Sequence, residues 1–161
     1  MAADRKDKDK SKEPVIENRR ARHDYHIDDT VECGLKLTGT EIKSLRAGQV
    51  SLGEGYVKAS DAPLGLTLHS VHIAEYPPAG ESRQHKPIRE RILLAHAREI
   101  KRLAEHVRAK GLTLVPLKIY FVRGRAKLLV GLARGKRQHD KRADIAAREA
   151  KREMDRQMRR R

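Results

Sequence analysis

Nearly all of the large hydrophobic residues of this 161-residue chain lie between residues 23 and 135, in short runs separated by turn residues. The run from Leu112 to Val122 is rich in β-branched and aromatic residues, and Arg123-Gly124-Arg125 separates it from a second run, Lys127–Leu132. Two such runs on either side of a short turn containing glycine predict a β-hairpin. Pro116, inside the first run, predicts a bulge or an edge position.

Four more segments have the composition and alternation of strands. They are residues 30–37, 50–52, 56–58 and 66–73, and the alternation in the last segment slips at His69-Ser70. About six short strands with few helices favour a small closed β structure. We therefore predict a mainly β fold: an OB-like small β-barrel flanked by two to three helices, with an open sandwich as the alternative.

The first predicted helix spans residues 40–48. Ile42 and Leu45 are three residues apart and lie on one side of such a helix, and Gly48 is suited to its end. Lys43 and Arg46 fall opposite that apolar side. They are either an ordinary solvent-exposed face or part of a nucleic-acid contact.

The second predicted helix spans about Arg89 to Lys110, because apolar residues recur at helical spacing and Gly111 follows. The basic residues of this segment, Arg89 and Arg91 among them, are expected on its exposed face, either as an ordinary solvent face or as part of an RNA contact.

The two ends of the chain cannot build a core. Residues 136–161 hold 11 basic and five acidic residues and few large apolar ones. We predict a disordered leader at 1–17, a barrel domain at 18–134 and a basic tail at 135–161 that is disordered when free. In the tail Arg148, Arg152, Arg156 and Arg160 recur every four residues, so a helix would place them on one face. Like charges at this spacing repel, so such a helix needs a polyanion beside it.

The charge of the whole chain points to the same class of partner. The formal net charge is +15 and the pI is about 10.3, which indicates nucleic acid or an anionic membrane surface. No apolar run approaches the roughly 20 residues that cross a bilayer, and residues 1–13 lack the apolar stretch of a signal peptide. We therefore expect a cytoplasmic protein without a membrane partner. With four Tyr, one Phe and no Trp, the chain suits the backbone and shape of a folded nucleic acid better than splayed bases.

No motif indicates catalysis. There is no metal-binding Cys or His pattern, no phosphate-binding glycine loop and no nucleophile elbow, so we expect no enzyme activity, metal, cofactor or small-molecule substrate. The lone Cys33 is expected to be a buried, inert thiol. Two alternatives stay open: a ribosomal or general nucleic-acid-binding protein, and an RNA nuclease that uses His23, His139 or Lys141.

Two basic segments flank the barrel region. Asn18 to Tyr25 is either a solvated lead-in or a phosphate clamp, since arginine forks match phosphate oxygens. Gly135 to Arg142 contains four basic residues that could hold phosphates, while His139 could stack on a base and Asp140 could orient a neighbour.

Ordered motifs in this chain resemble the SsrA-binding protein (small protein B) family, the bacterial partner of transfer-messenger RNA. The motifs are Asn18-x-x-Ala-Arg-His-Asp-Tyr25-x-Ile27, Glu32-x-Gly34, Gly39-Thr-Glu-x-Lys43-Ser-Leu-Arg46, His85-x-Pro-x-Arg-x-Arg91 and Gly135-Lys-Arg-Gln-His-Asp-Lys-Arg142. The chain departs from the family pattern at Glu54-Gly55-Tyr56 and at Ile92.

The resemblance implies an oligonucleotide-binding barrel that holds the tRNA-like domain of transfer-messenger RNA, and a tail that becomes helical on the ribosome. It implies delivery of that RNA, indirectly with elongation factor Tu, to the small-subunit decoding centre of stalled ribosomes. The tail would enter the empty mRNA channel, and the nascent peptide would be tagged for degradation. Together with the charge pattern, it predicts RNA contacts at Asn18, Arg20, Arg22, His23, Tyr25, Glu32, Lys43, Arg46 and Leu94. Ribosome contacts are predicted at Lys136, Arg137, His139, Asp140, Lys141, Arg142, Arg148, Arg152 and Arg156.

Overall fold

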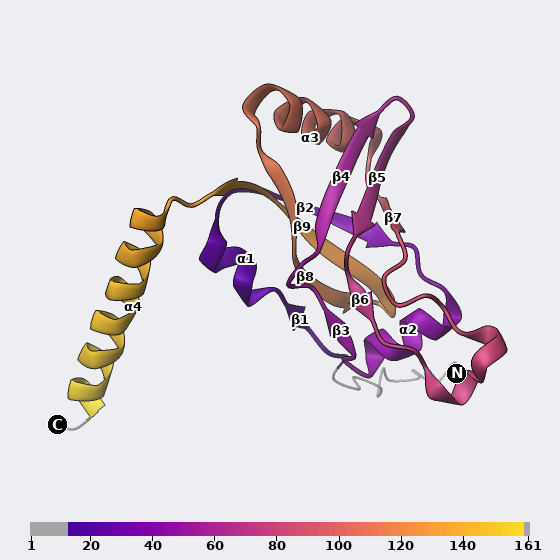
Figure 1. Cartoon of the computed structure of the whole chain (residues 1–161), viewed down its shortest axis with the longest axis horizontal. Helices are drawn as coiled ribbons and strands as arrows, with labels where there is room; N and C mark the ends of the chain where they lie inside the picture. The colour runs from indigo at the N-terminus through magenta and orange to yellow at the C-terminus, as the bar shows by residue number, and fades with distance from the viewer. Residues whose placement is uncertain (1–12, 160–161) are drawn as a thin grey trace, which may run out of the picture.

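The structure is a computed structural model that describes residues 13–159, apart from the side chains of Lys110, Gln138, His139 and Arg159 (Figure 1). Its elements are, in chain order, β1 (Ile16–Glu17), α1 (Arg19–Asp24), β2 (Tyr25–Leu35), α2 (Gly39–Arg46), β3 (Val50–Ser51), β4 (Tyr56–Asp61), β5 (Leu64–His69), β6 (His72–Ile73), the 3-10 turns η1 (Pro77–Ala79) and η2 (Glu81–Arg83), β7 (Arg91–Leu94), α3 (Ala97–Lys110), β8 (Thr113–Val122), β9 (Arg125–Gly135) and α4 (Gln138–Arg159).

The main sheet is antiparallel and closes on itself. Its strand order is β1-β8-β4-β5-β7-β2-β9, and β9 also pairs with β8, so six strands form a ring and β1 adds to its outside. This closure confirms the predicted OB-like barrel and shows that the open-sandwich alternative is wrong. The separate pair β3–β6 lies beside the ring.

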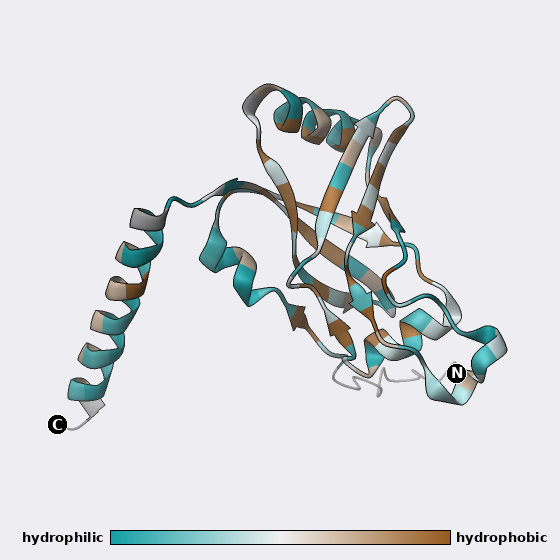
Figure 2. Cartoon of the chain, in the orientation of Figure 1, coloured by the Kyte–Doolittle hydropathy of each residue, from teal (hydrophilic) through white to brown (hydrophobic). Residues whose placement is uncertain are grey.

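The interior of the barrel is apolar because the strands alternate inward and outward residues. In β2, Val31, Cys33 and Leu35 point inward, while Glu32 is exposed. Cys33 is fully buried, which confirms its prediction, and burial raises the pKa of its thiol to about 11. Figure 2 shows the hydrophobic colour concentrated in the strands of the barrel, whereas α4 is largely hydrophilic.

The hairpin and its irregularities follow the sequence closely. β8 and β9 pair around the turn at Arg123-Gly124, and the register shifts between Pro116 and Lys118 as the proline predicted. The slip at His69-Ser70 separates β5 from β6, with Ser70 in the left-handed region at φ 55°. Gly55 is required by close packing, because a Cβ there would lie 2.5 Å from Val71 Cγ2.

The second predicted helix is wrong in its first third. Residues Arg91–Leu94 form β7, which pairs with β2 and β5, and the helix begins only at Ala97. Arg91 and Leu93 point inward and Ile92 and Leu94 outward, which is the period of a strand. Pairing with two distant strands therefore overrides the local helical spacing.

The prediction that Arg91 lies on a solvent face is also wrong. Arg91 and Glu41 are both fully buried, and Arg91 Nε donates to Glu41 Oε1 at 2.8 Å. Arg89 Nη2 donates to Glu41 Oε2 at 2.6 Å from the edge of the same cluster. This cluster joins α2 to the start of β7, because a buried arginine needs a buried carboxylate.

Four α-helices lie in the described part of the chain. α2 covers most of the helix predicted at 40–48, and at its start Glu41 accepts from the Thr38 backbone N–H at 2.8 Å. The short helix α1 was not predicted, and α4 extends away from the barrel (Figure 1). None of the described helices is both long and apolar enough to span a membrane.

Candidate nucleic-acid interface

The predicted RNA-binding residues fall at three places on the barrel surface. Leu94 lies in a groove lined by Gly34, Leu35, Leu37, Ile42, Leu94, Gly124, Arg125, Ala126 and Lys127, which we name the Leu94 groove, and Glu32 lies beside it, paired with Lys127. Asn18, Arg20, Arg22, His23 and Tyr25 lie on or beside α1, and we name them the α1 surface. Lys43 and Arg46 lie on α2. Tyr25 and Gly34 stand near opposite ends of β2, roughly 30 Å apart along an extended strand. The sequence motifs therefore do not converge on one site.

The Leu94 groove exists because a glycine stands between two long side chains. Gly34 pairs with Leu94 of β7 on one side and with Lys127 of β9 on the other. Directly paired residues point to the same face of a sheet, and two strand spacings separate the outer strands by about 10 Å. With no side chain at Gly34, the groove has a volume of about 420 Å³, and 58 % of Leu94 is exposed.

Glu32 lies on the same outward face as Gly34, two residues before it. Its carboxylate accepts hydrogen bonds from the Tyr120 hydroxyl and from Lys127 Nζ, the latter at 3.1 Å. The hydrogen bond from Tyr120, and to a smaller extent the hydrogen bond from Lys127, holds the pKa of Glu32 below its ordinary value. Burial, followed in size by the hydrogen bond to Glu32, raises the pKa of Tyr120 to about 12. Glu32 therefore orients a lysine and a tyrosine, which explains an acidic residue on a basic surface.

Lys43 and Arg46 are exposed on α2, as predicted. Lys43 Nζ lies 5.0 Å from the centre of the Tyr76 ring, and the Arg46 guanidinium lies 5.7 Å from that of Phe121. Such contacts hold a cation near an aromatic face without neutralising it. Arg46 Nε also lies 3.7 Å from Glu13 Oε1, so its charge is partly balanced, whereas the charge of Lys43 stays available to phosphates at the end of the barrel.

Asn18 is buried rather than displayed for RNA. Its amide Nδ2 donates to the carbonyl oxygens of Leu52 at 3.0 Å and Pro116 at 2.9 Å, and its Oδ1 accepts from the Ala21 N–H at 3.1 Å. Only 6 % of the residue is exposed. Asn18 thereby caps α1 and joins it to β8, so any effect of Asn18 on RNA passes through the placement of α1.

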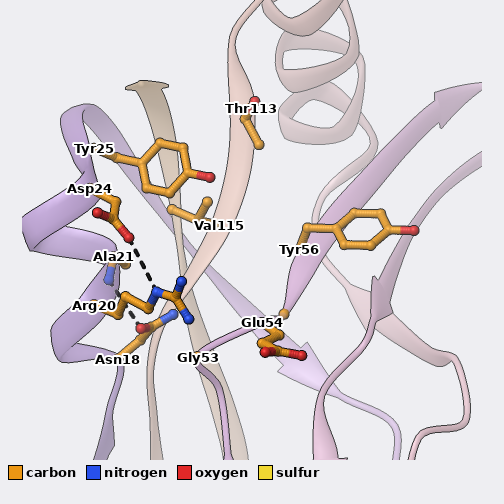
Figure 3. Close-up of a pocket in the computed structure, with 11 residues that line it drawn as sticks. Asn18, Arg20, Ala21, Asp24, Tyr25, Gly53, Glu54, Tyr56, Thr113 and Val115 are labelled. Carbon is orange, nitrogen blue, oxygen red and sulfur yellow. Dashed lines mark hydrogen bonds and ion pairs between the residues drawn. The ribbon is translucent and has the colours of Figure 1, made fainter. Parts of the chain in front are cut away.

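Arg20 and Tyr25 of the α1 surface border a pocket of about 290 Å³ between α1, β8 and the residues before β4, whereas Arg22 lines a different cleft with Lys118 and Arg148. Figure 3 shows Arg20 and the Tyr25 ring directed toward this pocket, whereas the Tyr56 ring points away from it. Tyr56 instead stacks on His69, with the ring centres 5.0 Å apart. Arg20 Nε donates to Asp24 Oδ2 at 3.3 Å, so its charge is partly balanced.

Asp24 is a charged centre that sequence reasoning missed. Its Oδ1 lies 2.9 Å from Lys141 Nζ and 3.0 Å from His23 Nδ1. The hydrogen bond from Lys141, followed by that from His23, lowers the pKa of Asp24 to about 2. The motif Ala21-Arg22-His23-Asp24-Tyr25 drew attention to its basic members, but the pairing with a residue 117 positions away could not be read from it.

The predicted ribosome-contacting residues occupy different environments. Lys136 is largely buried, with 7 % of its side chain exposed, and Lys141 is paired with Asp24. The carboxylate of Asp140 accepts from the Arg137 backbone N–H at 3.2 Å. Arg142, Arg148, Arg152 and Arg156 are exposed on α4. The side chain of His139 and the whole of Arg160 lie outside the described part of the structure.

The arginine ridge of the tail is present where the structure describes it. Arg148, Arg152 and Arg156 follow at four-residue intervals in α4 and share one face. Arg156 lies 3.7 Å from Glu153, a weak surface pair. Among residues 13–159 no group of three or more His, Cys, Asp or Glu side chains could hold a metal ion.

Lys127, Arg125 and Tyr120 also escaped the sequence reading as site residues. They belong to the hairpin β8–β9, and their relevance arises only when β9 is placed beside β2. The motif Glu32-x-Gly34 does place a glycine and a carboxylate on the same face of a strand, which hints at a site. The residues on the neighbouring strands that complete the site cannot be identified from this motif.

Known proteins that are similar to this chain share one family. Residues 15–160 match the family model described as SmpB protein. A relative named SsrA-binding protein from Thermobifida fusca (strain YX) is 55 % identical over 98 % of this chain and 96 % of its own length. A second of that name from Roseiflexus sp. (strain RS-1) is 52 % identical over 91 % of this chain and 92 % of its own.

A solved structure under the heading "tmRNA-SmpB: a journey to the center of the bacterial ribosome" is similar in fold, with a TM-score of 0.64. Its sequence is 50 % identical to this one, and the match covers 82 % of this chain and 94 % of the chain in that structure. A family match over almost the whole chain, relatives above 50 % identity and a shared fold lead to one conclusion: this chain belongs to the SmpB, or SsrA-binding, protein family.

Proposed function

We propose that this protein is a non-enzymatic, cytoplasmic RNA-binding adaptor of trans-translation. It binds the tRNA-like domain of transfer-messenger RNA and brings it to stalled ribosomes, so that the nascent peptide is tagged for degradation. Elongation factor Tu takes part only indirectly. The observation that carries the proposal is the Leu94 groove, where an exposed leucine faces a lysine across a glycine.

The chemistry of the groove suits RNA more than a protein or a small molecule. An exposed Leu94 offers apolar contact to a base or ribose, while Lys127 and Arg125 at the other side offer charge to phosphates. The groove volume of about 420 Å³ leaves room for a flat base to enter edge-on. Glu32 fixes Lys127 and can accept a hydrogen bond from a base amino group or a 2′-hydroxyl.

The groove is tested by competition binding at physiological salt, with labelled tRNA-like domain and unlabelled bulk tRNA. We expect Leu94→Ala to weaken binding about five-fold or more, as for an interface residue worth over 1 kcal/mol. Lys127→Ala lowers the slope of log affinity against log salt by about one. Ile88→Ala is the matched control, because Ile88 is 62 % exposed and lies outside the groove.

Competition by bulk tRNA at equal strength would favour a general nucleic-acid-binding protein. Equal loss in the Ile88 and Leu94 variants would remove the groove from the interface. Cleavage of labelled RNA above background would favour the nuclease alternative.

The tail serves the ribosome rather than transfer-messenger RNA in this proposal. The ridge of Arg148, Arg152 and Arg156 would meet ribosomal RNA along the empty mRNA channel, and neutralisation by phosphates removes the repulsion among the arginines. We expect the double change Arg148→Glu and Arg152→Glu to leave the affinity for transfer-messenger RNA nearly intact and to abolish tagging on stalled ribosomes.

The matched control places the same charge reversal on α3, with Arg98→Glu and Lys101→Glu. Both control residues are exposed on that helix. Equal loss of RNA affinity and tagging in the tail variant would contradict the division of labour. Amide exchange on the free protein then tests the predicted disorder of the tail, since protection across 145–158 without ribosomes would contradict it.

A further inference from the structure

We propose that a row of outward-facing residues, Lys36, Ile92, Thr67 and Lys58, docks a double-helical arm of the bound RNA across its minor groove. We name this row the β7 strip. The inference rests on the proposed RNA-binding function and deepens it, because it assigns a second contact surface beside the Leu94 groove and names the class of RNA that this surface takes. The strip recognises the shape and backbone of A-form RNA and reads no bases.

Strand pairing places the strip in one line across β2, β7, β5 and β4. Thr67 of β5 pairs with Ile92 of β7 on one side and with Lys58 of β4 on the other. The Lys36 backbone N–H donates to the Ile92 carbonyl oxygen at 3.0 Å, which continues the pairing of β2 with β7 by one residue. β4 and β5 run side by side in Figure 1, with β7 next to them. Three strand spacings separate the two lysines by about 14 Å along the sheet.

The side chains of the strip point away from the barrel interior, because side chains alternate along a strand. Each member has a buried neighbour beside it in the chain: Leu35, Leu93, Leu66 and Val57. Lys36 and Lys58 are exposed, 53 % of Ile92 is exposed, and Thr67 is half-buried. The strip therefore presents a positive charge at each end and an uncharged middle to the solvent.

The surroundings of the strip leave its lysines to an anionic partner. In the described part of the chain, the carboxylate of Glu32 pairs with Lys127 at 3.1 Å, and that of Glu90 lies 3.3 Å from His69 Nδ1. His69 pairs with Tyr56, so the next row across the sheet consists of Tyr56, His69 and Glu90. Because 71 % of the Glu90 side chain is exposed, its charge repels phosphates and marks the edge of the strip.

This pattern fits the minor groove of an RNA double helix. That groove is wide and shallow and displays 2′-hydroxyl groups between the two backbones, whereas the major groove is deep and narrow. The outer wall of a closed barrel is convex and can enter the shallow groove. Lys36 and Lys58 then meet phosphates of opposite strands, the Thr67 hydroxyl meets a 2′-hydroxyl, and Ile92 lies against ribose carbons.

The strip and the Leu94 groove form one continuous surface. Ile92 and Leu94 are two residues apart in β7, and Lys36 follows Gly34 by two residues, so each pair shares the outward face at a spacing of about 7 Å. A single folded RNA can therefore cover both places. The strip needs no aromatic side chain, which agrees with a chain that holds four Tyr, one Phe and no Trp.

The test measures the affinity of the full-length protein for labelled tRNA-like domain over a range of salt concentrations. Lys36→Ala and Lys58→Ala should each lower the slope of log affinity against log salt by about one, and the double change by about two, because each lysine meets a different phosphate. Lys101→Ala is the matched control, since Lys101 is exposed on α3 and lies outside the strip. It should leave the slope unchanged.

Thr67 gives a readout that a general positive surface would not move. Thr67→Val keeps the shape of the side chain and removes its hydroxyl, so it should weaken binding roughly two- to ten-fold at an unchanged salt slope. Hydroxyl-radical footprinting then identifies the protected helical arm. Substitution by 2′-deoxynucleotides in that arm should cost the parent protein a similar factor and cost the Thr67→Val variant nothing more, because both changes remove one contact.

Unchanged slopes in both lysine variants, an equal change in the Lys101 control, or losses from Thr67→Val and 2′-deoxy substitution that simply add would overturn the strip. A footprint without protection on both strands of a helical arm would also overturn it and would favour a protein partner for this face. Leu94→Ala separates this inference from the proposed function. If Leu94→Ala weakens binding and the strip variants do not, the strip fails and the proposed function stands. If the strip variants behave as expected and Leu94→Ala has no effect, the groove fails and the strip stands.

Discussion

The buried carboxylate of Glu41 offers the sharpest test of how this fold is held together. Burial alone raises the pKa of Glu41, but hydrogen bonds from Arg89 and the Thr38 backbone and the charge of Arg91 outweigh it. Together they lower the pKa of Glu41 from 4.5 to about 2. Such a difference corresponds to roughly 3 kcal/mol of folding free energy at neutral pH.

Replacing Glu41 by glutamine leaves Arg91 buried without a counter-charge. Removing one member of a buried pair costs about 3–5 kcal/mol. With a urea dependence of about 2 kcal/mol per molar, the unfolding midpoint falls by roughly 1.5–2.5 M. Urea titration followed by far-UV circular dichroism at pH 7 measures it. Glu90→Gln is the control: Glu90 is a highly exposed partner of His69, so its loss costs under about 0.5 kcal/mol.

The same residue predicts an acid dependence of stability. Because the pKa of Glu41 is lower in the folded than in the unfolded protein, its contribution is complete above pH about 4.5 and is lost as the pH falls toward 2. Glu41→Gln should remove this part of the pH dependence. Adding Arg91→Met should recover part of the lost stability, because no fully buried charge then lacks a partner, although the carbonyl groups of Val71, Arg89 and Pro87 lose their donor. A cost below about 1 kcal/mol for Glu41→Gln, or no recovery in the double variant, would refute the reasoning.

Two further outcomes follow from packing on the two faces of the barrel wall. Gly131→Ala should lower the free energy of unfolding by about 1–3 kcal/mol, because the added Cβ would lie 2.9 Å from Leu117 Cδ1. The control Gly65→Ala should be nearly neutral, because its Cβ would have no atom within 4 Å. Equal urea midpoints for the two variants would contradict this reasoning. Cys33 should resist thiol reagents at pH 8 in the native protein and react at once in denaturant, since burial raises the pKa of its thiol to about 11; rapid native labelling would show that the barrel opens.

Much of the fold and of the family assignment was accessible from the sequence. The hairpin β8–β9, the irregularity at Pro116 and the break at His69-Ser70 all depend on neighbouring residues, so local patterns predicted them. The same holds for the four-residue spacing of arginines in the tail, which a helix converts into a ridge whatever surrounds it.

The errors arose where distant residues decide the structure. The local pattern around Arg91 predicts a solvent-facing arginine on a helix. Its side chain is instead buried on the inner side of β7, where Glu41, 50 positions earlier, supplies its counter-charge. Asn18 reads as part of a basic RNA-binding lead-in, yet its amide is used up by carbonyl groups of Leu52 and Pro116.

The sequence by itself determined the class of this protein: a small β-barrel with a basic tail, its ordered family motifs and a polyanionic partner. Only the tertiary structure decided where those motifs act. It set Leu94 and Lys127 on either side of Gly34, and it brought Asp24 to Lys141. The physical reason is that charge pairing and burial depend on distance in space, and strand pairing in a closed barrel joins residues that no local pattern relates.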